Sequence, residues 1–386
     1  MRRMVIAMSC VLTLGALAAP PAYFKTNWAD AQRAARTADR LLFIHFTVSW
    51  SGEDREMETR VLATAAVQKA LADFVPVSLD CTISTRDETA PEARAANERM
   101  KACGGESHPF FVVATPDGDF LYAIRGYLSG EELIARLGKA KETRAEYDAF
   151  LAYAAKADKD SPEFKIRQLK FLVKFRKFLE ASSVMESMLG ADPDGSKGLA
   201  GEARLAMILI APSGEGPAKT QGLYETVKSL DPRNERGLWE RAVQAQGERY
   251  YRHSLRSETE ADFRAKLAKP TAMVEELIDN AARFDDRRAV YHMALFLYTS
   301  QKKFDKAHAA IDDLLKNAAP AEKHAVQKLR LELFVQQEQF AQARSVVAEL
   351  VKTASPAEAQ ELQRRDKELE LQAAVAGDKT TRPAAR

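Results

Sequence analysis

The order of apolar runs in the first 145 residues constrains the fold most strongly. The runs LLFIHFTV (41–48) and FVPVSLD (74–80) are short and almost wholly apolar, which is typical of buried strands. A third stretch, HPFFVVATPDGDFLYAIRGY (108–127), predicts two strands joined by a turn at Asp117-Gly118. Helical patterns lie between and around these runs, so the segment predicts a small α/β domain. The expected helices cover 28–38, 52–72 and 91–102, with a last helix that Ser129 and Glu132 cap.

Several residues of this region follow the order seen in the thioredoxin family. Trp50 stands where the family has the Trp before its Cys-x-x-Cys motif, and Asp80 ends the next strand. Pro109 stands where the family has a cis-proline facing the active site, while TPDG and RGY match the turn and the last strand. Residues 24–145 therefore resemble a thioredoxin-like domain. The match is closest to the periplasmic branch in which such a module precedes helical repeats.

The resemblance fails at the redox motif itself. Ser51 and Asp54 occupy the two cysteine positions, and a serine hydroxyl supplies neither the attacking thiolate nor a resolving thiol. His45 stands about where many thioredoxins carry a buried acid. We predict no catalytic residue here and a capped helix start instead. In that start Ser51 accepts from the amide of Asp54, and Asp54 returns a bond to the amide of Ser51.

A hydrolytic site is the competing interpretation of the same residues. If Pro109 packs near Ser51, then Ser51, His108 and Asp54 resemble the members of a Ser-His-Asp triad. The chain has no GxSxG turn at Ser51, and an acidic first helical turn opposes a developing oxyanion. The capped helix start is therefore favoured over hydrolysis.

The cysteines leave three alternatives open. The mature chain keeps Cys81 and Cys103 if Cys10 leaves with an export signal. The two residues form a structural disulfide, stay unpaired, or act as a relocated redox pair. The last alternative implies a thiol–disulfide oxidoreductase, although the spacing is not that of a Cys-x-x-Cys motif.

The first residues have the features of an export signal. A basic start, MRRM, precedes the apolar run VIAMSCVLTLGALAA and the small residues Ala16–Ala18. This pattern predicts a signal peptide over residues 1–18 and a periplasmic or secreted protein. An uncleaved membrane anchor is the alternative. No other run is apolar enough to cross a bilayer, so no transmembrane helix is expected in the mature chain.

The second half has a recurring helical pattern. The pair Phe-x-x-Ala occurs at 178/181, 304/307 and 340/343. This spacing resembles tetratricopeptide repeats and predicts an all-α helical array over 146–373. Ordinary helical hairpins are the alternative, and either arrangement stacks amphipathic pairs. We expect a disordered tail over 374–386.

Net charge and residue spacing limit the kinds of partner that the sequence predicts. The formal net charge is +2, and basic clusters are not interleaved with aromatic residues, so nucleic acid is not an expected partner. The six histidines are scattered without ligand spacing, so we expect neither a metal nor a cofactor. The expected function is non-catalytic binding of a protein or peptide, as a scaffold or chaperone-like adaptor. The candidate binding residues are Trp50, His108, Lys170 and Lys174.

Overall fold

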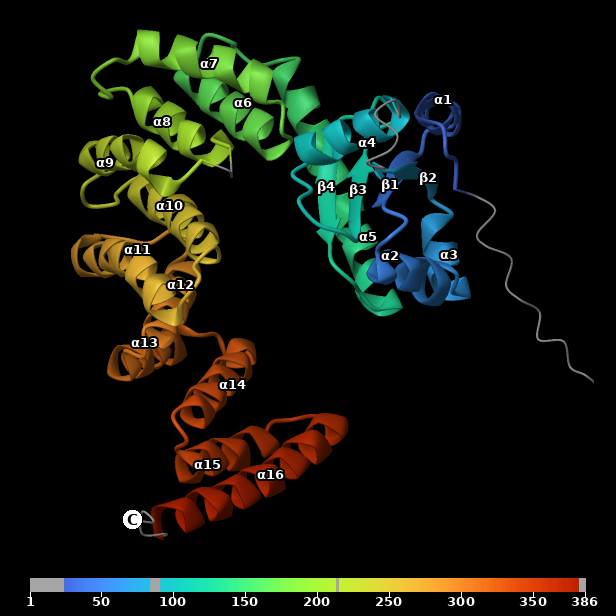
Figure 1. Cartoon of the computed structure of the whole chain (residues 1–386). Coiled ribbons are helices and arrows are strands. Elements are labelled where there is room, and N and C mark those ends of the chain that lie inside the picture. Colours follow the sequence, from blue (N-terminus) through green and yellow to red (C-terminus); the bar gives the residue numbers. More distant parts are fainter. Residues whose placement is uncertain (1–23, 84–90, 213–214, 382–386) are drawn as a thin grey trace, which may run out of the picture. The chain divides into compact units, whose positions relative to one another are not determined.

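The chain divides into two compact units, Met1–Val184 and Met185–Arg386. The computed structural model describes residues 24–83, 91–212 and 215–381 (Figure 1). The predicted signal peptide, residues 1–18, lies outside the described residues. The boundary expected after residue 145 falls inside helix α5 (Gly130–Ala154), so the first unit extends further into the helical half than the sequence pattern indicated.

The first unit contains a four-stranded mixed sheet in the order β2-β1-β3-β4. Strand β1 (Leu41–Thr47) pairs in parallel with β2 (Phe74–Asp80) and antiparallel with β3 (Phe110–Ala114). Strand β4 (Phe120–Arg125) pairs antiparallel with β3. Because β1 and β2 run in parallel while β3 runs the other way, the ends of β1 and β2 and the start of β3 meet at one edge of the sheet.

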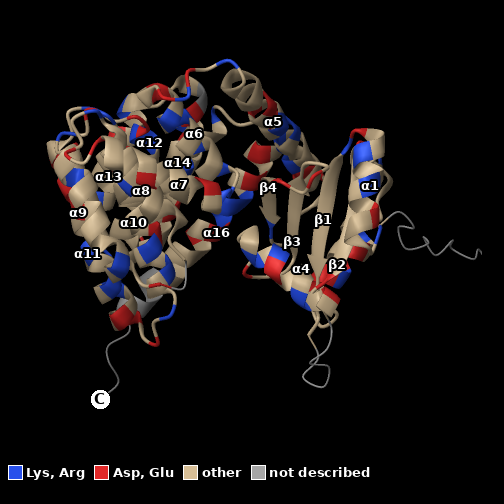
Figure 2. Cartoon of the chain, turned by 90° about the horizontal axis from the view of Figure 1, so that it is seen from above, with Lys and Arg blue, Asp and Glu red and all other residues tan. Residues whose placement is uncertain are grey.

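Helices cover both faces of this sheet, so every residue of β3 is buried. Side chains of β1 alternate between the faces: Leu42, Ile44 and Phe46 join one core cluster, while Phe43 stacks on Phe111 on the other face. Helices α1 (Trp28–Ala38) and α4 (Pro91–Ala102) contribute to the first cluster. The second face carries α5, α3 (Ala65–Leu71), α2 (Gly52–Glu56) and the π-helical turn η1 (Met57–Leu62). In Figure 2 the blue Lys and Arg positions and the red Asp and Glu positions fall mainly on the helices, and few fall on the strands.

A helical hairpin extends the first unit beyond the sheet. Helix α6 (Pro162–Lys174) returns along α5, and the rings of Phe150 and Phe171 stack with centroids 4.0 Å apart. The hydroxyl of Tyr147 donates to Asp119 Oδ2 at 2.6 Å. Arg176 Nε donates to the carbonyl oxygen of Ala102 at 2.7 Å. These contacts attach the hairpin to the α/β domain, which explains why the unit continues past residue 145.

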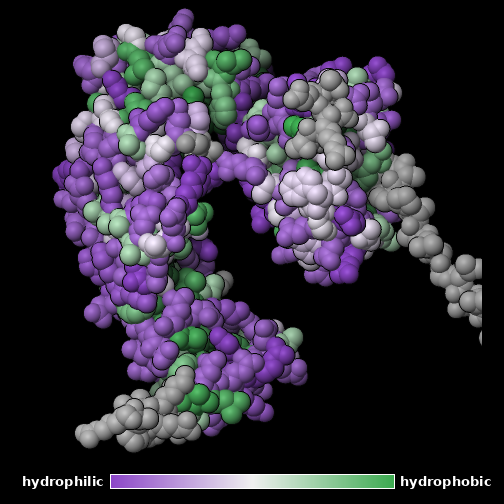
Figure 3. Space-filling view, viewed as in Figure 1, coloured by the Kyte–Doolittle hydropathy of each residue, from purple (hydrophilic) through white to green (hydrophobic). Residues whose placement is uncertain are grey.

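Helix α7 (Phe178–Ala191) contains the boundary between the two units, and the helices after it pack in sequence, each on the next. The visible surface is largely hydrophilic, with small hydrophobic patches (Figure 3). None of the helices in the described residues has the length and apolar character needed to span a bilayer. After α7 the elements are α8 (Leu199–Ile210), the 3-10 turn η2 (Pro217–Thr220), α9 (Gln221–Leu230), α10 (Leu238–Ser254), α11 (Glu260–Asn280), α12 (Arg287–Ser300), α13 (Phe304–Asn317), α14 (Pro320–Gln336), α15 (Phe340–Val351) and α16 (Pro356–Thr381).

The recurring Phe-x-x-Ala pattern marks helix starts. Phe178, Phe304 and Phe340 are the first residues of α7, α13 and α15, and the three alanines are fully buried. Each turn before the Phe has one residue at positive φ and a backbone bond spanning five residues, the geometry of a Schellman turn. The positive-φ residues are Arg176, Lys302 and Glu338. The bonds are Lys177 N to Leu172 O, Lys303 N to Tyr298 O and Gln339 N to Phe334 O, at 2.8–2.9 Å.

A second repeated turn was missed in the sequence. The loops DPDGSKG (192–198) and DPRNERG (231–237) share a leading Asp whose carboxylate accepts backbone amides of the following helix. Asp192 accepts from Ala200 N at 3.0 Å, and Asp231 accepts from Leu238 N at 2.9 Å. The shared Asp-Pro and final Gly were the available signal. The final Gly is at positive φ in both loops, where it precedes the helix.

The C-terminal tail differs from its prediction. Helix α16 continues to Thr381, whereas the sequence indicated disorder from residue 374. Arg344 on α15 contacts Asp366 on α16 through Nε and Oδ1 at 2.9 Å. The first part of α16 thus packs on α15, and the helix continues from this packed part through the Ala-rich residues 373–376 to Thr381.

Candidate functional site

Four loops meet at the sheet edge where β1 and β2 end. The amide of Ser49, after β1, donates to Thr82 Oγ1, after β2, at 2.8 Å. The amide of Gly126, after β4, donates to the carbonyl oxygen of Pro109, before β3, at 2.9 Å. The His108–Pro109 peptide bond is cis. Strand order therefore brings together segments that are up to 77 residues apart in sequence, between Ser49 and Gly126.

Ser51 caps the helix that begins at this edge. Its Oγ accepts from the amide of Asp54 at 3.0 Å, as the sequence predicted. The return bond from Asp54 to the amide of Ser51 is not formed, because that amide donates to Val48 O at 3.2 Å. Asp54 Oδ2 instead accepts from the amide of Val48 at 3.0 Å. Asp54 is 1% exposed, so it belongs to the interior of the site rather than to an exposed helix start.

Two histidines flank the buried carboxylate of Asp54. His45 Nε2 lies 3.5 Å from Asp54 Oδ1, and His108 Nδ1 lies 3.6 Å from Asp54 Oδ2. His108 Nδ1 is also 3.0 Å from the carbonyl oxygen of Phe46. Since a carbonyl only accepts, Nδ1 carries the proton in that bond and Nε2 is the remaining acceptor of a neutral His108. The position at which the sequence suggested a replaced acid is thus a buried histidine paired with a relocated acid.

Large apolar side chains are exposed around this cluster. Trp50 is 73% exposed, and its ring centroid lies 6.3 Å from that of His108. Ile83 follows the loop bonded to Ser49, and Tyr127 follows the glycine bonded to Pro109; both are more than two-fifths exposed. Sequence reasoning found Trp50 and His108 but missed Ile83 and Tyr127. Their positions directly after predicted strands were the only available signal.

The arrangement lacks the hydrogen bonds of a hydrolytic triad. Ser51 Oγ is used as an acceptor by the helix amide, and no hydrogen bond joins Ser51 to His108 among the described residues. A nucleophilic serine needs a base within hydrogen-bond reach to take its proton. The geometry therefore supports a helix cap with a buried acid, and it gives no activated hydroxyl.

Cys81 and Cys103 are free thiols in the structure, so of the three alternatives it contains the unpaired one. Burial, with smaller contributions from Asp80 and Asp54, raises the pKa of Cys81 to about 12. Burial also raises the pKa of Cys103 to about 11, against a smaller opposing effect of Arg176. Both thiols are protonated at neutral pH, which opposes the thiolate attack that disulfide exchange requires.

The two basic candidates lie on another element. Lys170 and Lys174 are exposed on α6, whereas Trp50 and His108 belong to the four loops. Lys174 forms an ion pair with Glu146 on α5 and sits 5.7 Å from the centroid of the Phe175 ring. The structure therefore joins Trp50 and His108 in one site and places the two lysines on the helical hairpin.

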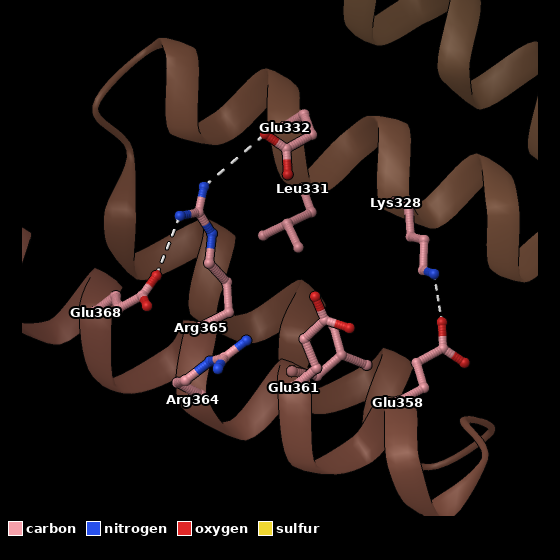
Figure 4. A pocket seen from close by; sticks show the side chains of 9 residues that line it. Lys328, Leu331, Glu332, Glu358, Glu361, Arg364, Arg365 and Glu368 are labelled. Carbon is pink, nitrogen blue, oxygen red and sulfur yellow. Dashed lines mark hydrogen bonds and ion pairs between the residues drawn. The ribbon is translucent and has the colours of Figure 1, made fainter. Parts of the chain in front are cut away.

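The helical unit has a separate cavity of about 350 Å³ between α14 and α16 (Figure 4). Its charged side chains largely neutralise one another: Lys328 pairs with Glu358, and Arg365 lies between Glu332 and Glu368. Such a lining does not select a ligand charge. Within the described ranges, no group of three or more His, Cys, Asp or Glu side chains is placed to hold a metal ion. The sheet edge remains the stronger candidate site.

Comparison with known proteins adds no family to this picture. No protein-family model matches the chain, and no curated protein matches it significantly. The function must therefore be argued from the site itself.

Proposed function

We propose that this chain is an exported, non-catalytic binding protein that holds a protein or peptide segment at the four-loop edge of its sheet. In this proposal the α/β domain is thioredoxin-like and has lost its redox chemistry. The sheet order, the mixed strand pairing and the cis bond before Pro109 support the resemblance. Export to the periplasm or the exterior is part of the same proposal.

The observation that carries the proposal is the contrast between Ser51 and Trp50. The positions that would perform redox chemistry are occupied by a helix cap and a buried acid. The neighbouring indole is nevertheless 73% exposed, although moving a large aromatic side chain out of water lowers the free energy of the system. Burying about 150 Å² of such a ring contributes on the order of 4 kcal/mol before the costs of association.

The helical half supports binding in a different way. Its repeated turns and buried alanines favour a tetratricopeptide-like array, in which stacked helix pairs form an extended surface. We propose that this array contributes to partner binding, as scaffold or adaptor proteins require. Thiol–disulfide exchange through Cys81 and Cys103 is disfavoured because burial raises both pKa values to about 11 or higher.

A peptide selection tests the binding site. A random peptide library would be selected on the full mature chain, and the selected peptides compared on Trp50→Ala by fluorescence anisotropy. We expect at least about tenfold weaker binding, which corresponds to about 1.4 kcal/mol. Leu179→Ala is the matched control, because Leu179 is 89% exposed on α7. Equal affinity for wild type and Trp50→Ala would exclude the four-loop edge as the binding site.

An insulin reduction assay tests the absence of redox chemistry. We expect turnover at the background rate, since neither Ser51 nor Asp54 supplies a thiolate. Turnover that disappears in Cys81→Ser would establish the oxidoreductase alternative and contradict the non-catalytic part of the proposal.

A further inference from the structure

Both ring nitrogens of His45 face a carboxylate oxygen. Nε2 lies 3.5 Å from Asp54 Oδ1, and Nδ1 lies 3.7 Å from Glu58 Oε1. The side chains of His45 and Asp54 are 1% and 2% exposed. His45 Nε2 and Asp54 Oδ1 are buried, and neither atom has a hydrogen-bond partner in the described part of the chain. Two unpartnered polar atoms that face each other in a protein interior require an explanation.

The protonation state of the ring decides whether these contacts attract. Neutral imidazole has one N–H and one lone pair, so in either tautomer a lone pair faces a carboxylate. Imidazolium has an N–H on both nitrogens and can donate to Asp54 and Glu58 together. We infer that His45 is held as an imidazolium that bridges Asp54 and Glu58. This bridge fixes the position of Asp54 below the four loops, and it depends on the His45 proton.

The surroundings of His45 favour the cation. Its ring stacks on Phe111 with centroids 4.5 Å apart and an interplanar angle of 22°, and the face of an aromatic ring attracts a cation. A buried charge is tolerated when it is paired, and Asp54 provides the partner. The other titratable groups at the cluster are Glu58 on η1, His108 before β3 and Cys81 after β2. The pKa of Cys81 is raised to about 12, so this thiol adds no charge at neutral pH.

The bridge reaches the proposed binding surface through Asp54. Its second carboxylate oxygen holds the amide of Val48 and lies 3.6 Å from His108 Nδ1, and Val48 and Trp50 are two residues apart. Loss of the His45 proton would leave the Asp54 carboxylate buried without its counter-charge. The folded state then binds more protons than the unfolded chain, so its stability falls as pH rises. The effect on ligand affinity rests on the proposed function.

Nuclear magnetic resonance measures the protonation state directly. The full mature chain would be labelled with ¹⁵N in its histidine rings, and the His45 signals identified by their loss in His45→Gln. An isolated histidine is mostly neutral at pH about 7.5. We expect both ring nitrogens of His45 to show protonated shifts at that pH. A neutral tautomer at pH about 7.5 would overturn the inference.

Substitution of the exposed carboxylate provides the matched comparison. Glu58 has a side chain that is 44% exposed, so Glu58→Gln should fold. Because it removes one of the two carboxylates that face the ring, it should shift the His45 signals towards those of a neutral tautomer at pH about 7.5. Glu56→Gln, with an exposed partner at Arg60, should leave the His45 signals unchanged. The signal shifted by Glu58→Gln also identifies His45 if His45→Gln does not fold. Equal effects of both substitutions would contradict the bridge.

Ligand binding separates this inference from the proposed function. Peptides selected on the wild-type protein should bind at least roughly threefold more weakly at pH about 8.5 than at pH about 6. This difference should be smaller in Glu58→Gln. If His45 is doubly protonated but peptide binding does not depend on pH, the bridge exists but does not influence peptide affinity. If the peptides bind wild type and Trp50→Ala equally well, the four-loop edge is not the binding site. The magnetic resonance result for His45 would still stand.

Discussion

The two units bury carboxylates in opposite ways. Glu240, at the start of α10 in the helical unit, accepts backbone amides of Asp285 and Asp286 at 2.7 Å each and the side chain of Asn234 at 3.2 Å. Asp54 in the α/β domain accepts one amide on Oδ2, and within the described ranges its Oδ1 has no hydrogen bond. Both residues are 1% exposed, so burial alone does not distinguish them.

The two carboxylates differ in the partners that compensate their burial. Fixed backbone amides satisfy Glu240 at every pH at which it is ionised, which suits a group that ties α10 to the turn before α12. Asp54 instead lies between two imidazoles, 3.5 Å and 3.6 Å from its carboxylate oxygens, and an imidazole can be neutral or charged in a protein. A buried carboxylate whose partners are backbone amides is typical of a structural role. A buried carboxylate whose partners are titratable side chains is typical of a functional site.

Replacing Glu240 should have the largest effect. In Glu240→Ala two backbone amides and the Asn234 side chain lose their acceptor, which should lower the free energy of unfolding by about 3–5 kcal/mol. Urea unfolding followed by far-ultraviolet circular dichroism measures the loss. Glu248→Ala is the control on the same helix, because Glu248 is exposed and pairs with Arg252. Similar losses in both variants would show that the buried acceptor is not structural.

Replacing Asp54 should cost less. Asp54→Ala removes the acceptor of one amide and the partner of two histidines, and we expect destabilisation by about 2–3 kcal/mol. Hydrogen exchange of the β1 amides reports the change in the α/β domain. Glu53→Ala alters only an exposed residue of the same helical turn and should stay within about 0.5 kcal/mol. A loss as large as that of Glu240→Ala would remove the proposed contrast.

The two thiols test whether burial suppresses cysteine chemistry in the α/β domain. Burial raises the pKa of Cys81 to about 12 and that of Cys103 to about 11. Iodoacetamide at pH about 8 should alkylate Cys81 at least about tenfold more slowly in the native protein than in urea. Since the folded state keeps these thiols protonated, their contribution to stability is present below the unfolded pKa. It is lost as pH rises above about 9 towards the folded values. Rapid native labelling of Cys81 would favour the redox alternative.

Replacing Lys174 should have the smallest effect. Its ion pair with Glu146 is half exposed on both sides, and exposed pairs contribute about 0–1 kcal/mol. Lys174→Ala should therefore change the melting temperature by less than about 2 °C. Peptide affinity measured on the same variant shows whether α6 takes part in binding. A large loss of stability would mean that Lys174 is a structural residue of the hairpin.

The sequence by itself determined most elements of both halves. Apolar runs and turn residues predicted all four strands, because burial on both faces of a sheet demands short continuous apolar segments. The Phe-x-x-Ala spacing predicted an all-α array, but it did not predict that Phe178, Phe304 and Phe340 each begin a helix. Ser51 was correctly assigned as a cap, because capping depends on residues three positions apart.

Only the tertiary structure decided which polar groups meet. Whether Asp54 turns outward to the amide of Ser51 or inward to His45 depends on the space beneath the β1–α2 turn, and no local pattern encodes that space. The helix that contains residue 145 continues to Ala154, and contacts from Tyr147 and Arg176 attach the hairpin to the α/β domain, which no local pattern indicated. Ile83 and Tyr127 join Trp50 because the strand order places their loops at one edge. Local spacing selects helices, strands and caps, whereas burial and pairing across the sheet select the site.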